Sequence, residues 1–253
     1  MRIEDLVCLQ KNDSIPWRVF IPEMATKEYA VLWLQGWTSS MDSHREGVER
    51  MARTTGVTFA TLDPAGHGLH ELPLEQSTRK MQHEEVIAIY DELVKLGYKK
   101  IIVIGGSFGG YMAALLTGKR PVHAAVLRAP AMYDDTEFEL EHSKTRRWQN
   151  PLKGQEEKAD QPYIHDNEAL RSINNFDGQV FVLEHELDEQ VPRIMPEMYF
   201  KHAKHGNYLL VPKTMHSPKL MKNPQPHFAY IEHLVVSIVK AIQLAANLDG
   251  EEA

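Results

Sequence analysis

The chain of 253 residues has a single cysteine, Cys8. One cysteine cannot form a disulfide within the chain, which is typical of proteins from a reducing compartment. We find no apolar run that approaches membrane-spanning length, and residues 1–7 lack the apolar core and cleavage site of a signal peptide. We therefore expect a cytoplasmic protein with no membrane partner.

The motifs of common cofactor sites are also missing. Gly118-Lys119-Arg120 has neither the spacing nor the Ser or Thr of a phosphate-binding loop. No G-x-G-x-x-G opens the early strands, no H-E-x-x-H occurs, and a single cysteine excludes a thiolate cluster. The sequence predicts neither a cofactor nor a metal.

Excess positive charge is absent as well. The formal net charge is −7 and the isoelectric point is near 6.0, which argues against nucleic acid or an anionic membrane as the main partner. We find no internal repeat, low-complexity tract or Pro/Ser-rich linker, so residues 1–253 are interpreted as one domain. A homodimer is left open.

Apolar periodicity predicts alternating strands and helices over most of the chain. An opening hairpin is followed by strand–helix units, which indicate a parallel sheet covered by helices on both faces. Strands are predicted at 6–10, 17–21, 29–35, 57–62, 101–104, 122–127, 179–184 and 208–211. Helices are predicted at 41–54, 80–96, 111–116, 191–205 and 226–248.

The alternation stops between residues 129 and 176. These 48 residues are rich in charge and also carry Tyr133, Phe138, Trp148 and Tyr163. A long irregular segment inside a compact domain is usually a functional insertion. We interpret residues 129–176 as an inserted cap, with a solvated loop as the alternative.

The most informative stretch is Gly105-Gly106-Ser107-Phe108-Gly109, which follows the apolar strand at 101–104 and precedes a helix. It matches G-x-S-x-G in the strand–turn–helix setting that this motif requires. Glycines permit a sharp turn that exposes the serine hydroxyl, and the following helix directs its N-terminal N–H groups toward an anion. Ser107 is thus a candidate nucleophile.

A serine nucleophile needs a base and an orienting acid, in the chain order Ser, Asp or Glu, His for this kind of turn. Asp188 follows the strand at 179–184, and His216 follows the strand at 208–211. Asp188 competes with the carboxylates of Asp134, Asp135, Glu184, Glu186 and Glu189. His216 competes with His67, His70, His185, His202 and His205, the last two of which we place on an exposed helix face.

Two backbone N–H groups are candidates for binding the oxyanion. One belongs to Phe108, the residue after the nucleophile, and the other to Trp37 in the loop after the third strand. The Trp37 side chain is interpreted as either core or substrate contact. The turn Asp63-Pro64-Ala65-Gly66-His67-Gly68 is interpreted as structural, because Pro and Gly fix such geometry.

With these residues, the chain resembles the α/β-hydrolase superfamily over nearly its full length. Residues 105–112 resemble the nucleophile turn of its prolyl-oligopeptidase-like and serine-aminopeptidase-like branches, and Leu187 to Pro192 resembles their acid turn. The chain is also similar to small bacterial carboxylesterases with a cap, including cinnamoyl and feruloyl esterases. Gln35 departs from the family's usual His, and Glu184-His185 from its usual His-Gly.

The resemblance implies an α/β fold with an eight-stranded, mostly parallel sheet and hydrolysis of esters or amides through an acyl-enzyme. We expect a serine carboxylesterase that acts on small-molecule esters with small or aromatic acyl groups. The aromatic side chains of Trp37, Tyr133, Phe138, Trp148 and Tyr163 are candidate substrate contacts. The alternatives are a small peptidase or a ligand-binding receptor with the same fold.

Overall fold

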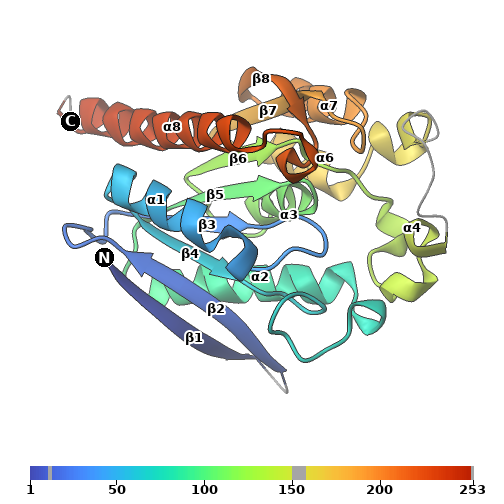
Figure 1. The fold of residues 1–253 in the computed structure, drawn as a ribbon, viewed down its shortest axis with the longest axis horizontal. Coiled ribbons are helices and arrows are strands. Elements are labelled where there is room, and N and C mark those ends of the chain that lie inside the picture. Colours follow the sequence, from blue (N-terminus) through green and yellow to red (C-terminus); the bar gives the residue numbers. More distant parts are fainter. Residues whose placement is uncertain (11–12, 150–157, 252–253) are drawn as a thin grey trace.

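The computed structural model describes residues 1–10, 13–149 and 158–251 (Figure 1). Eight strands form one sheet in the order β1-β2-β4-β3-β5-β6-β7-β8. Their bounds are β1 Arg2–Gln10, β2 Asp13–Ile21, β3 Tyr29–Leu34, β4 Thr58–Leu62, β5 Lys100–Gly106, β6 Ala124–Arg128, β7 Gln179–Leu187 and β8 His205–Met215. The pairs β1/β2 and β2/β4 are antiparallel and the other five are parallel. The predicted fold class is confirmed.

Helices cover both faces of this sheet (Figure 1). The first face carries α1 (Arg45–Thr55) and α8 (Gln225–Glu251). The second carries α2 (Arg79–Lys95), α3 (Phe108–Thr117), α6 (Glu168–Asn175) and α7 (Ile194–His202). Every residue of β3 and β4 is buried, as expected for mainly apolar strands with helices on both sides.

The observed ends of some elements differ from the predicted ends where apolar periodicity is weak. β8 runs over His205–Met215, well beyond the predicted 208–211, and His205 belongs to this strand because α7 already ends at His202. β8 is the last strand of the sheet, so many of its side chains are exposed and polar. Before α1, a 3₁₀ turn at Asp42–His44 replaces the first turn of the predicted helix.

The expectation that no apolar run approaches membrane-spanning length is wrong for α8. Residues Gln225–Ala245 have a mean hydropathy of 1.4 in their most apolar window, so by length and composition this helix could cross a membrane. Its buried side chains pack against the sheet. The core helix of a soluble protein can have the same length and composition. The buried residues are Ile231, Val235, Ile238, Val239 and Ile242.

The chain between β6 and β7 contains short helical pieces. They are η3 (Asp135–Glu137), η4 (His142–Lys144), α4 (Arg146–Gln149) and η5 (Pro162–Ile164), followed by α6. α6 buries Leu170 and Ile173 in the core beside α3, whereas α4 lies beyond the edge toward which β5 and β6 point (Figure 1). Residues 150–157, part of the predicted cap, lie outside the described residues.

Candidate active site

Ser107 occupies a strained turn between β5 and α3. Its backbone has φ 53° and ψ −115°, a conformation that L-residues rarely adopt and that often marks functional sites. A Cβ atom on Gly105 would come within 2.1 Å of the Gly109 carbonyl oxygen, and one on Gly109 within 2.2 Å of the Leu34 carbonyl oxygen. The glycines are therefore required by close backbone contacts, and the turn leaves Ser107 partly accessible.

The structure brings Ser107, His216 and Asp188 together. His216 Nε2 lies 2.9 Å from Ser107 Oγ, and His216 Nδ1 lies 2.7 Å from Asp188 Oδ2. Asp188 directly follows β7 and His216 directly follows β8, so adjacent parallel strands deliver both side chains to one sheet edge. All three residues directly follow a strand of the sheet.

The tautomer of His216 follows from the environment of Asp188. Burial alone would raise the pKa of Asp188, but hydrogen bonds from His216 and from the Val191 and Gln190 N–H groups lower it overall. An ionised carboxylate only accepts hydrogen bonds, so Nδ1 of His216 carries the proton. Nε2 is then free to accept the hydroxyl proton of Ser107.

The competing acids of β7 and of the loop after it make other hydrogen bonds. Glu189 accepts a hydrogen bond from the backbone N–H of His216 at 3.0 Å. Glu186 accepts one from the backbone at the end of β8, and Glu184 accepts one from the Tyr208 hydroxyl. None of these three bonds involves the imidazole ring of His216.

Asp134 and Asp135 are engaged within the segment between β6 and β7. Asp134 accepts hydrogen bonds from Thr136 and lies 3.3 Å from a nitrogen of Arg146. Asp135 pairs with Arg171 at 2.7 Å. The distances bring Asp188, and not these two residues, to the ring of His216.

Behind His216 lies a buried pair that the sequence did not reveal. His185 Nδ1 lies 2.8 Å from the carbonyl oxygen of Met215, and its Nε2 lies 3.5 Å from a nitrogen of Arg128. Burial, together with the charge of Arg128, lowers the pKa of His185 to about 3. The neutral ring therefore donates to the residue that precedes His216. The sequence signal that could have revealed this contact is Arg128, a charged residue at the end of the apolar strand β6.

The loop after β3 approaches the nucleophile closely. A Cβ atom on Gly36 would lie 3.6 Å from Ser107 Cβ, so the next residue, Trp37, begins beside the site. The Trp37 N–H makes no hydrogen bond within the described residues, and Phe108 provides an N–H at the start of α3. Both candidate oxyanion donors therefore belong to segments that adjoin Ser107.

Gln35 anchors this loop to the turn at residues 63–68. Its amide nitrogen donates to Asp63 at 3.1 Å, and its amide oxygen accepts from Thr61 at 3.0 Å. Asp63 also accepts N–H groups from Met41 and Leu69. The departure from the family's usual His is thus accommodated by a buried amide network, and Asp63 has the structural role that we predicted for its turn.

The five candidate aromatic contacts fall into two groups. The Trp37 ring lies 5.2 Å from that of Phe108, and the Tyr133 ring lies 5.7 Å from Phe108. The other three lie elsewhere in the segment between β6 and β7. Phe138 packs against His83, Trp148 is exposed, and Tyr163 is partly buried.

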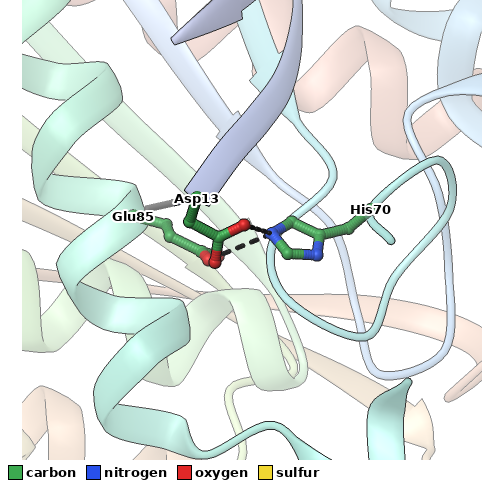
Figure 2. Close-up of side chains that lie close together, drawn as sticks. All are labelled: Asp13, His70 and Glu85. Carbon is green, nitrogen blue, oxygen red and sulfur yellow. Dashed lines mark ion pairs between the residues drawn. The ribbon is translucent and has the colours of Figure 1, made fainter. Parts of the chain in front are cut away.

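One group of side chains in the described residues could hold a metal ion (Figure 2). His70 Nε2 faces Asp13 at 3.4 Å and Glu85 at 3.3 Å. The Leu72 N–H donates to His70 Nδ1 at 3.1 Å, so the ring proton lies on Nε2, the atom a metal would need. In this tautomer the Nε2 proton of His70, and not a metal ion, lies between the ring and the two carboxylates. The absence of a metal remains a prediction.

Comparisons with solved structures give the same fold at low identity. Est1E from Butyrivibrio proteoclasticus, bound to ferulic acid, has a TM-score of 0.70 and 16% identity, covering 95% of this chain and 98% of its own. An esterase from Pyrobaculum calidifontis has a TM-score of 0.65 and 20% identity, covering 94% and 85%. A thermostable esterase from Pseudomonas putida has a TM-score of 0.67 and 15% identity, covering 95% and 82%.

No curated protein matches the sequence. A family profile described as the alpha/beta hydrolase fold matches residues 29–169, which include β3 to β6 and the turn at Ser107. The match covers more than half of the chain and agrees with the sheet order and the strained serine turn. The chain belongs to the α/β-hydrolase fold family.

Proposed function

We propose that the protein is a serine carboxylesterase that cleaves small-molecule esters with small or aromatic acyl groups. The observation that carries this proposal is the continuous pair of hydrogen bonds from Ser107 through His216 to Asp188. The names of the similar structures, which include esterases and an Est1E complex with ferulic acid, support an ester as the substrate.

The first step is attack of Ser107 Oγ on the ester carbonyl carbon. His216 Nε2 accepts the hydroxyl proton as the new C–O bond forms, and Asp188 stabilises the resulting imidazolium. The Phe108 and Trp37 N–H groups bind the negatively charged oxygen of the tetrahedral intermediate. His216 then donates its proton to the departing alkoxide, which leaves as the alcohol.

The second step releases the acid. Water attacks the acyl-enzyme carbonyl while His216 Nε2 accepts a proton from it, and collapse of the second intermediate returns the proton to Ser107 Oγ. The enzyme ends in its starting state. We further propose that residues 129–176 form a cap over this site, because Arg147 of α4 lies 5.3 Å from the Trp37 ring and the Tyr133 ring lies 5.7 Å from that of Phe108.

The test is hydrolysis of a chain-length series of nitrophenyl esters, hydroxycinnamate esters and aminoacyl amides, with Ser107→Ala as control. We expect ester cleavage that the substitution abolishes, and labelling of the wild-type serine by a fluorophosphonate. Faster cleavage of amides than of esters would favour a peptidase instead. No turnover and no labelling would favour a ligand-binding receptor.

A further inference from the structure

Two arginines near the nucleophile have no carboxylate partner among the described residues. Arg79 is only 3% exposed, and its Nε makes no hydrogen bond within the described part of the chain. Its one hydrogen bond there is from Nη2 to the Asp134 carbonyl oxygen at 2.7 Å. Arg147 in α4 is exposed, and no ion pair joins it to a described carboxylate.

Both guanidinium groups lie against aromatic rings that adjoin Phe108. The Arg79 Cζ atom is 5.0 Å from the centre of the Tyr133 ring. The Arg147 Cζ atom is 5.3 Å from the Trp37 ring and 6.0 Å from the Tyr133 ring. The rings of Trp37 and Tyr133 both contact Phe108, the residue after Ser107, so the two cations lie one ring away from it.

Three carboxylates of the segment between β6 and β7 are paired with other arginines. Arg146 lies 3.3 Å from Asp134 and 3.6 Å from Glu137, and Arg171 lies 2.7 Å from Asp135. Arg79 and Arg147 therefore remain as cations without a described carboxylate partner on the rings of Tyr133 and Trp37, in a chain whose net charge is −7.

Other groups near the site respond to the charges of these two arginines. Burial, with the positive charges of Arg79 and Arg147, lowers the pKa of His142, whose ring lies 4.4 Å from Trp37, to about 3. Burial and the charge of Arg147 also lower the pKa of Lys158. Two buried hydroxyls, of Tyr111 and Tyr133, lack hydrogen-bond partners among the described residues. Cations and unpaired donors together match an acceptor-rich anion.

We propose that Arg147 and Arg79 bind a carboxylate on the substrate, so that the protein prefers anionic esters over neutral esters of the same shape. This inference depends on the esterase function proposed above. A guanidinium group on an aromatic face can donate two parallel hydrogen bonds to a carboxylate, which gives both strength and orientation. The carboxylate can belong either to the acyl group or to the alcohol.

Two matched pairs of esters test the preference. For the acyl side, the mono-nitrophenyl ester of adipic acid is compared with methyl nitrophenyl adipate, in which the free carboxylate is methylated. For the alcohol side, 3-acetoxybenzoate is compared with methyl 3-acetoxybenzoate. The pair whose carboxylate lies on the correct side of the ester should show the preference. In that pair we expect kcat/KM to be about tenfold or more higher for the anionic ester than for the neutral ester.

Two neighbouring arginines in α4 provide the variant and its control. Arg147→Ala should lower the anionic-to-neutral ratio by about tenfold or more, since a charge-assisted hydrogen bond is lost. Arg146→Ala removes an arginine that is also exposed but is paired with Asp134, and should leave the ratio within about twofold. Loss of packing on Trp37 alone would slow both esters of a pair and leave the ratio unchanged.

The outcomes separate the two proposals. A wild-type preference for the neutral ester in both pairs, or an equal fall of the ratio in both arginine variants, would overturn the anion preference while the esterase function stands. Failure to hydrolyse any of the four esters, with no fluorophosphonate labelling of Ser107, would remove the esterase function and the anion preference with it. Labelling of Ser107 without hydrolysis of either anionic ester would overturn the anion preference alone.

Discussion

At the scale of single residues, the role of Asp188 rests on one contact. Its Oδ2 lies 2.7 Å from His216 Nδ1, while its other oxygen accepts two backbone N–H groups at 2.8 Å. These bonds fix both the carboxylate and the tautomer of the imidazole. The carboxylate can therefore orient His216 without itself taking the proton.

We predict that Asp188→Asn lowers kcat by about 10⁴-fold with little change in folding, because an amide no longer holds the required tautomer. The measurement is steady-state hydrolysis of a nitrophenyl ester, with circular dichroism to check the fold. Asp135→Asn is the control, since Asp135 pairs with Arg171. Near-normal rates in Asp188→Asn would assign the acid role to another carboxylate.

The residues around the nucleophile differ in how far the sequence predicts them. Ser107, Asp188 and His216 each follow an apolar strand, and parallel strands that end at one sheet edge bring such residues together. Arg79 and Arg147 have no such signal. They reach Tyr133 from α2 and α4, and only the three-dimensional path of the segment between β6 and β7 makes this contact.

At the scale of elements, apolar periodicity predicted each of the eight strands, but not all of their ends. β3, β4 and β5 are buried between helices, so their apolar residues mark them well. β8 pairs with one neighbour only and alternates with solvent-facing polar residues, which hides its length. The short helical pieces after β6 have no period that a sequence could display.

The start of α2 depends on one side chain. Thr78 is its N-cap, and the hydroxyl oxygen accepts the Met81 N–H at 3.1 Å. We predict that Thr78→Ala lowers the free energy of unfolding by about 1 kcal/mol, because this N–H then lacks its partner. Urea denaturation measures the change. Thr78→Ser keeps the hydroxyl and should retain most of the stability, so equal losses in both variants would contradict the capping role.

At the scale of the whole molecule, buried neutral histidines link the fold to pH. His83, His142 and His185 are each less than 5% exposed and come from α2, η4 and β7. Burial lowers the pKa to about 4 for His83 and about 3 for His142 and His185, with nearby Lys or Arg charges adding to the effect. The unfolded chain has no such burial, so its histidines titrate near their ordinary pKa of about 6.5.

These shifts predict acid sensitivity well above the pH at which carboxylates titrate. Between about pH 6.5 and pH 4 the unfolded chain binds protons at these histidines while the folded chain does not, so stability falls as the pH falls. Each histidine contributes at most about 1.4 kcal/mol per pH unit in that window, and nothing above it.

Urea denaturation at pH 7.5, 6 and 5 measures the slope. His142→Gln should flatten it, whereas His205→Asn, at an exposed position of β8, should not. A wild-type stability that is constant from pH 7.5 to 5 would mean that these rings accept protons in the folded state. It would also mean that Arg79 and Arg147 lie farther from His142 in solution than in the structure.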